Sequence, residues 1–193
     1  MWAIVTVAVI AALVAAAVPT LSQWVDTTRV TTTAETLRDI AVGIDSFNNT
    51  AKTGPTKYTT PRYLHLLDTI VVNGDSAGCR SNIKYNAASV TGWTTNGPYV
   101  SFYISPYGVD TPIGRVGDST SRTMGAFGSR RTSQTDSVFI QIDSVDVGLA
   151  RMMDLDVDGT VNANGDTVRF TAPGADSLVL LSWWVPLPHG TSC

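Results

Sequence analysis

Three aspartates alternate with apolar residues in the segment Asp154-Leu155-Asp156-Val157-Asp158-Gly159. Calcium prefers oxygen ligands, and alternating acids followed by glycine begin like a calcium-binding loop. Carboxylates held so close together repel one another unless a cation lies between them. The segment therefore offers a candidate calcium site made of Asp154, Asp156, Asp158 and the nearby Asp166, to which Asn162 and Asn164 could add oxygens.

Two other interpretations of this segment compete with a calcium loop. An EF-hand would require a bidentate acid at the twelfth position, which here is Gly165, so that type of site is disfavoured. A β-hairpin without metal needs only a strand before Gly159, a turn from Gly159 to Gly165, and a returning strand from Thr167 to Phe170. We favour the hairpin, which requires no cofactor, and keep calcium as the alternative.

A second chemical pattern, Gly74-Asp75-Ser76-Ala77-Gly78, matches the G-x-S-x-G sequence around a hydrolase nucleophile. That chemistry needs a helix after the serine, but residues 79–82 have no helical pattern. The two histidines, His65 and His189, have no Cys or His partner at zinc spacing. Trp183-Trp184 would suit a stacked sugar ring, although core or subunit packing is the more ordinary role for such a pair. We therefore expect a turn at 74–78 and a protein that is not an enzyme.

Composition restricts the class of protein further. The chain of 193 residues has a net charge of −3, and charged residues make up only 15% of it. There is no basic run that would predict nucleic-acid binding. The many Thr, Ser and Gly residues suit an extracellular, β-rich surface better than a cytosolic enzyme.

These candidate residues follow a long apolar N-terminal stretch. Residues Trp2–Leu21 include no charged side chain, and roughly 20 apolar residues in a helix would span the core of a bilayer. Beyond Pro19 the pattern becomes amphipathic, with apolar residues at steps of three, four and seven: Val30, Leu37, Ile40, Ala41, Ile44 and Phe47. We predict one helix from Met1 to about Phe47, a helical unit over residues 1–50 and a globular head over residues 51–193.

The apolar stretch has three interpretations. A cleavable signal peptide would place its small-residue site at Ala15–Ala17, but it would also have a basic residue ahead of the apolar run, and none is present. A single-span membrane anchor is the second interpretation. An assembly helix that packs against copies of itself is the third, and the uninterrupted amphipathic continuation favours it.

This helix resembles the N-terminal helix of bacterial type IV pilins and of type II secretion pseudopilins. The residues that carry the resemblance are Val9-Ile10-Ala11-Ala12-Leu13-Val14-Ala15-Ala16-Ala17-Val18-Pro19, followed by Leu21-Ser22-Gln23. The family usually has a glutamate near the start of this run, whereas residues 1–21 contain no acid. The resemblance covers about the first 50 residues and is only architectural in the head.

The resemblance implies a structural subunit of an extracellular, pilus-like helical filament. Its partners would be other copies of itself, the inner membrane before assembly, the pilus assembly machinery and the prepilin peptidase. The filament core would contain Trp2, Ile4, Val9, Ile10, Leu13, Val14, Val18, Pro19 and Leu21. Pro19 lacks an N–H and crowds the carbonyl of Ala15, so the helix could kink there or melt locally within a filament.

Two other functions remain open at this stage. A pseudopilin of a type II secretion system would use the same helix, with calcium bound at Asp154–Asp166. A membrane-anchored extracytoplasmic binding domain would bind a ligand through Trp183-Trp184 or through residues 106–131, and it would not polymerise.

For the head, the change toward a period of two after residue 83 predicts strands. The expected strands are residues 83–89, 99–104, 138–143, 145–155, 167–171 and 178–185. One or two helical turns are expected at 63–67, and a long surface loop at 106–131. The expected fold class is α+β, with the long N-terminal helix packed on an antiparallel sheet in a pilin-like arrangement.

The two cysteines, Cys79 and Cys193, generate a first prediction. In an exported head we expect them to form a disulfide, which would stabilise the fold by roughly 4 kcal/mol on the chain-entropy model. Intact mass should rise by two alkyl groups only when reduction precedes alkylation. Two thiols that react before reduction would contradict the pairing.

Overall fold

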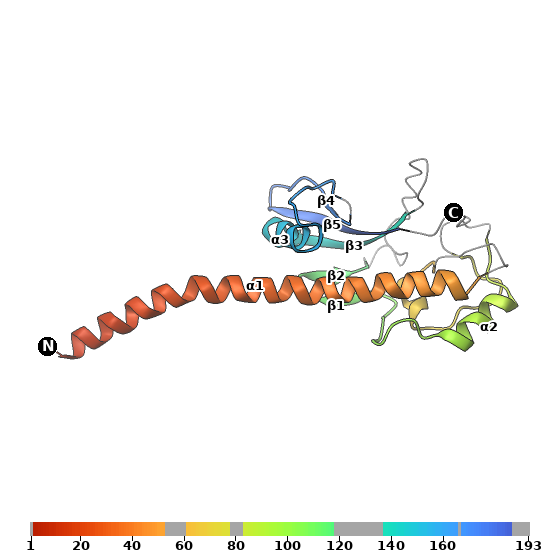
Figure 1. The fold of residues 1–193 in the computed structure, drawn as a ribbon, viewed down its shortest axis with the longest axis horizontal. Coiled ribbons are helices and arrows are strands. Elements are labelled where there is room, and N and C mark those ends of the chain that lie inside the picture. The colour runs from red at the N-terminus through yellow and green to blue at the C-terminus, as the bar shows by residue number, and fades with distance from the viewer. Residues whose placement is uncertain (1, 53–60, 78–82, 118–136, 166, 187–193) are drawn as a thin grey trace.

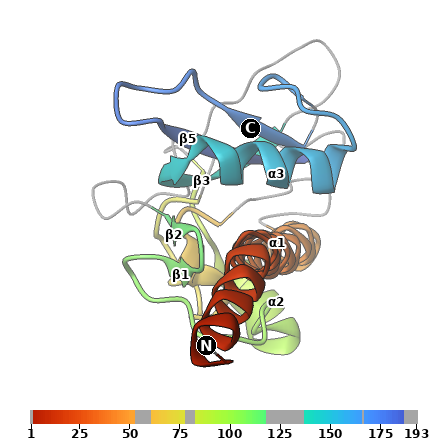
Figure 2. The same ribbon diagram turned by 90° about the vertical axis from the view of Figure 1, so that its left-hand side faces the viewer.

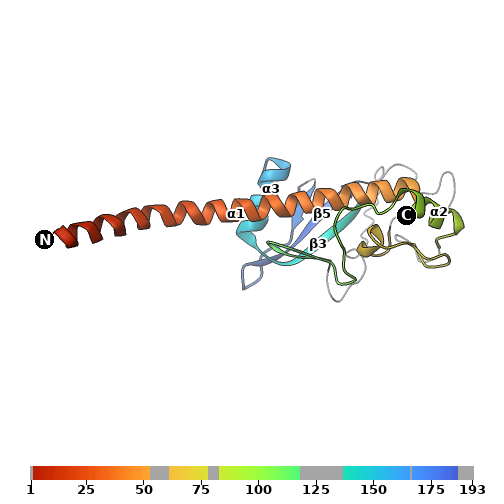
Figure 3. The same cartoon turned by 90° about the horizontal axis from the view of Figure 1, so that it is seen from below.

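The computed structural model describes residues 2–52, 61–77, 83–117, 137–165 and 167–186. One long helix, α1 (Trp2–Thr50), runs along the molecule, and the other elements form a head beside its C-terminal half (Figure 1). The N-terminal half of α1 projects away from this head, as the view from below also shows (Figure 3). The predicted α+β class and the predicted long helix are therefore confirmed.

The C-terminal half of α1 forms one wall of the hydrophobic core. The predicted apolar face is buried: Val30, Leu37, Ile40, Ile44 and Phe47 are each at most 2% exposed. Ala41 packs at the edge of the same core. Threonines on this half bond carbonyls one turn back, as Thr33 Oγ1 does to Arg29 O at 2.8 Å, so their hydroxyls are satisfied within the helix.

Over the described residues, the sheet has five antiparallel strands in the order β1-β2-β3-β5-β4. Its strands are β1 (Val109–Thr111), β2 (Gly114–Val116), β3 (Ser137–Asp146), β4 (Val168–Phe170) and β5 (Leu178–Pro186). Along β5, burial alternates: Val179, Leu181 and Trp183 are buried, and the residues between them are more exposed. This alternation places one face of the sheet in the core that α1 shares.

Three short helices lie in the described part of the head. The 3₁₀ helix η1 (Leu64–Leu67) confirms the helical turn expected at 63–67. Helix α2 (Ala87–Asn96) packs near the C-terminal end of α1 (Figure 1). Helix α3 (Val147–Asp158) runs across α1 on the side where β3 and β5 lie, as the view along the molecule shows (Figure 2).

Several predicted strands are correct and several are wrong. The strands expected at 138–143, 167–171 and 178–185 are present as β3, β4 and β5. Residues 99–104 form no strand, and the surface loop expected at 106–131 contains β1 and β2 in its described part.

The strands expected at 83–89 and 145–155 are wrong because helix caps override the alternating pattern. Asn86 and Ser89 form a reciprocal capping box that starts α2. Asp146 accepts hydrogen bonds from Gly148 N and Leu149 N and so starts α3, which ends at Gly159 in the left-handed conformation (φ 75°). The hairpin expected around Gly159 is therefore replaced by the end of a helix.

Helix α2 provides a test of how closely the head packs on α1. A Cβ at Gly92 would collide with the carbonyl of Thr50 at the end of α1. Gly92→Ala should therefore destabilise the head by about 1–2 kcal/mol net, because the clash exceeds the roughly 1 kcal/mol that alanine adds to helix propensity. Thermal melting in mild detergent, followed by circular dichroism, measures the change.

Gly174→Ala is the matched control for this substitution. A Cβ at Gly174 has its nearest neighbour at 3.9 Å, so the variant should melt close to the wild type. Equal melting temperatures for Gly92→Ala and the wild type would show that α2 does not pack on α1 as described.

Candidate functional site

The first candidate site is the uncovered N-terminal half of α1. Val18 is 57% exposed and Leu21 is 59% exposed, and Trp24 beside them is 68% exposed. These three residues follow one another at steps of three along the helix and so form a patch, and exposed apolar patches mark interaction surfaces. Over the described residues, no helix is both long enough and apolar enough to cross a membrane.

The other predicted core residues belong to the same helix. The backbone of Trp2, Ile4, Val9, Ile10, Leu13, Val14 and Pro19 is helical, and their side chains lie outside the described part. The helix is continuous through Pro19 in this single chain, and Figure 1 shows that the N-terminal segment curves away from the axis of the rest. Local melting at Pro19 within a filament stays a prediction.

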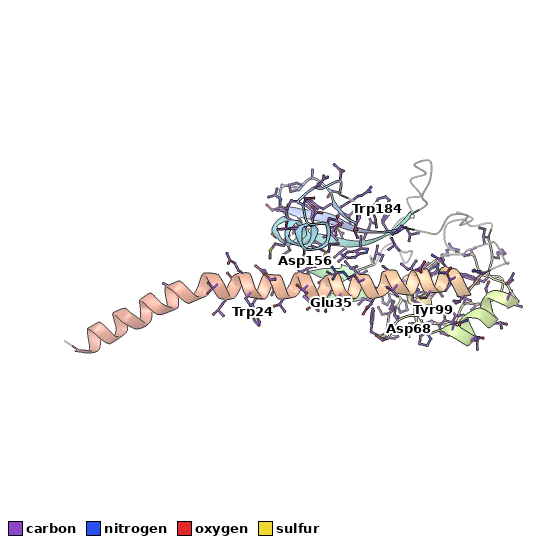
Figure 4. All side chains as sticks on the ribbon, viewed as in Figure 1. Trp24, Glu35, Asp68, Tyr99, Asp156 and Trp184 are labelled. Carbon is purple, nitrogen blue, oxygen red and sulfur yellow. The ribbon has the colours of Figure 1, made fainter. Side chains whose placement is uncertain are left out.

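The second candidate site is the group of carboxylates on α3. Because these residues are helical, side chains four apart share a face, so Asp154 and Asp158 lie together. Asp156, two residues from each, is exposed on another face of α3 (Figure 4). Asp166 lies outside the described residues. The structure thus brings two of the four predicted ligands together.

Both carboxylates bind the backbone that connects α3 to β4. Asp154 is fully buried, and its Oδ2 accepts a hydrogen bond from Asn162 N at 2.5 Å. Asp158 Oδ2 accepts from Thr167 N at 3.0 Å and from Val168 N at 2.9 Å. The pair therefore fixes both ends of the connection, at Asn162 and at the start of β4, onto α3.

One oxygen of this pair has no donor. Asp154 Oδ1 is buried and makes no hydrogen bond. Burial is the largest cause that raises the pKa of Asp154; the Asn162 N–H lowers this pKa, whereas the neighbouring Asp158 carboxylate raises it. A proton on Asp154, shared with Asp158, would satisfy the buried oxygen and remove the repulsion between two charges.

A cation is the alternative occupant of the same place. Within the described ranges, no three His, Cys, Asp or Glu side chains come together in a way that could hold a metal ion. The two carboxylates that do converge are occupied with backbone donors through three of their oxygens. Calcium binding stays a prediction, to which Asp166 would be essential.

The tryptophan pair is divided between the two faces of the sheet. Trp183 is 4% exposed and belongs to the core. Trp184 lies on the opposite face, where Phe139 packs at 5.1 Å between ring centroids and the Arg169 guanidinium lies 4.2 Å from its ring centroid. These neighbours support packing rather than a free platform for a sugar.

The remaining predicted residues are only partly described. Gly74 adopts φ 91°, and Ser76 pairs with Lys84 in an isolated bridge, so the described part of 74–78 is a turn as expected. The next described helix after this motif is α2, which begins at Ala87. Cys79, Cys193 and His189 lie outside the described residues.

The sequence alone does not show the pairing of Asp154 with Asp158, because acids that alternate with apolar residues indicate a strand. The available signal was the set of helix caps, Asp146 and Gly159, around apolar residues at helical spacing. The backbone donors from residues 162, 167 and 168 depend on tertiary structure and have no local signal.

The carboxylate pair predicts an unusual dependence of stability on pH. Because the pKa of folded Asp154 is raised, its contribution to stability is fully present below the unfolded pKa and is lost as pH rises through the folded pKa. Asp154→Asn should therefore melt at a higher temperature than the wild type at neutral pH, with the difference shrinking toward pH 4. The amide can accept from Asn162 N and donate to Asp158, as the protonated acid would.

Two further measurements make this prediction specific. Asp156→Asn removes an exposed charge from the same helix and should leave the pH profile unchanged. Melting in calcium and in chelator separates the proton from the cation, because a bound calcium would stabilise the wild type but not Asp154→Asn. A wild type that is more stable than Asp154→Asn at neutral pH in chelator would contradict the shared proton.

Comparison with known proteins adds no assignment to this geometry: no family model, curated protein or solved structure matches the chain.

Proposed function

We propose that the chain is a structural subunit of a helical filament of the type IV pilin kind, assembled through the N-terminal half of α1. The observation that carries the proposal is the division of one helix into two halves. One face of the half from Val30 to Phe47 is buried against the head, whereas Val18, Leu21 and Trp24 on the preceding half are exposed and the structure describes no element that covers them.

The exposed half needs an apolar environment. Burying one large apolar side chain is worth about 1.5–3 kcal/mol relative to water, so a helix with this sequence favours burial by tens of kcal/mol gross. Lipid would satisfy this need before assembly, and the same surface of other copies would satisfy it afterwards. Close helix packing rather than expulsion of water would then favour the filament over the membrane.

The continuity of α1 favours an ordered polymer over an irregular aggregate. The same helix that would pack in the filament core also provides Leu37, Ile40 and Ile44 to the core of the head. Each head is therefore fixed in orientation relative to the N-terminal half of its own α1. Identical units that associate head to tail without closing a ring generate a helix.

The architecture of the head agrees with this proposal at a coarse level. A five-stranded antiparallel sheet shares its core with the C-terminal half of α1, and β1 contacts this helix directly. The described surface around Trp24 also includes Asp26 and Arg29, which form an ion pair at 3.6 Å where the polar half of α1 begins.

A charge in the apolar half should separate assembly from folding. Leu21→Asp places an acid in the proposed filament core, where an unpaired charge costs several kcal/mol, so filaments should be lost while the head keeps its melting temperature. The acid lies at the end of the apolar run, so the variant should still fractionate with the membrane. Electron microscopy of material sheared from cells, with mass spectrometry of the subunit, measures assembly.

Val42→Asp is the matched control. Val42 lies on the same helix and is 66% exposed, but it is beside the head rather than on the free half. Its substitution should leave filaments at the wild-type level. If the wild type yields no filaments and purifies as uniform single particles in detergent, the chain is an anchored domain and the proposal fails.

A further inference from the structure

A cleft lies in the head near the C-terminal end of α1, away from the free half. It has a volume of about 410 Å³ and is formed by η1, the segments around it and a buried tyrosine, Tyr85. A cleft of this size fits a small organic molecule. Its polar lining includes Arg62, Tyr63, His65 and Asp75, and Ile70 is among its apolar lining.

The guanidinium of Arg62 is held in place by an aromatic stack. It lies 5.3 Å from the centroid of the Tyr63 ring, and that ring stacks on His65 with centroids 5.5 Å apart and planes 16° apart. The backbone also holds this residue, because Arg62 N donates to the Tyr85 hydroxyl at 3.2 Å. A guanidinium restrained in this way loses little conformational freedom when it binds a ligand.

The restrained guanidinium has no anionic partner in the part of the chain that the structure describes. The ion pairs among those residues are Asp26–Arg29 and Asp110–Arg115, and Arg62 belongs to neither. Its side chain is half-buried in the wall of the cleft. A planar fork of N–H donors with this geometry matches the two oxygens of a carboxylate.

The other polar groups of the cleft restrict the ligand further. Asp75 adds one negative charge to the lining, so it repels a doubly charged phosphate about twice as strongly as a singly charged carboxylate, and the lining favours the carboxylate. Burial lowers the pKa of His65, so its imidazole is neutral at pH 7 and adds no second cation. Asp75 can accept hydrogen bonds from a hydroxyl or an ammonium group of the ligand.

We propose that this cleft binds a small organic carboxylate that also carries hydrogen-bond donors. Arg62 holds the carboxylate as a bidentate partner, Asp75 accepts from the donors, and the apolar edge at Ile70 contacts the carbon skeleton. Two sources share this chemistry: an acidic sugar, whose donors are hydroxyls, and a free α-amino acid, whose donor is its ammonium group. The site is independent of filament assembly.

Calorimetric titration of the full chain in mild detergent tests the site with three probes. Glucuronate represents the acidic sugars, alanine represents the amino acids, and glucose is the neutral control. Binding of glucuronate or alanine at least about tenfold tighter than glucose is expected, and the probe that binds identifies the source. Absence of binding by both acids, or equal binding of glucose, overturns the proposal.

Substitutions then locate the binding. Arg62→Gln should lower the affinity for the acid that binds at least about tenfold. Arg62→Lys keeps the charge but not the planar fork of donors, so its affinity should lie between those of Arg62→Gln and the wild type. Arg151→Gln removes an exposed arginine from α3 and should leave the affinity unchanged. If the Arg62→Gln variant folds and binds the acid with wild-type affinity, the assignment of Arg62 is overturned. If that variant does not fold, wild-type affinity in Arg62→Lys overturns the assignment instead.

Discussion

The burial of one face of α1 is the interaction on which the rest of the structure depends. Leu37, Ile40, Ile44 and Phe47 are fully buried and contact the same core to which the sheet and α3 contribute. Removal of these side chains from water is worth about 1.5–3 kcal/mol each, which is large compared with the stability of a small domain. Because the buried face begins at Val30 and the helix begins at Trp2, the N-terminal half of α1 extends beyond the head as a helical continuation of the core.

The packing of α3 on α1 explains why two carboxylates of α3 accept hydrogen bonds from the backbone that leads to β4. Ala150 and Met153 pack into the shared core, so the next turn, with Asp154 and Asp158, lies close beneath the chain that leads to β4. Buried N–H groups of that chain need acceptors, and two carboxylates four residues apart supply them on one side of a helix. The cost is two acids in one poorly hydrated place, which a shared proton or a bound cation can offset. The four-residue spacing of Asp154 and Asp158 therefore has two consequences: it holds the backbone that leads to β4, and it contributes to the raised pKa of Asp154.

The sequence predicted best where burial is periodic over many residues. The long stripe from Val30 to Phe47 identifies α1 and its inner face without tertiary information, and the period of two in residues 138–142 identifies β3. Prediction failed at α2 and α3, where short helices are set by caps at Asn86 and Asp146, and where Asp154 to Asp158 alternate as a strand would. The sequence identifies Asp154 and Asp158 as candidate ligands, but it does not show that they share one face of a helix. The Arg62 cleft had no local signal, because its partners come from separate segments that only the fold brings together.

The N-terminal half of α1 and the head are suited to different tasks because they differ in charge. Residues Trp2–Leu21 have no charged side chain, so in an assembly they can pack closely but cannot select a polar ligand. Near the other end of the same helix, the head holds a restrained guanidinium beside a carboxylate in a cleft. If the N-terminal halves of α1 form the interior of a filament, any charged group that binds a small molecule must lie in the heads, where water reaches it. A subunit built on this helix can therefore vary the ligand of its cleft without changing the surface that would join it to its neighbours.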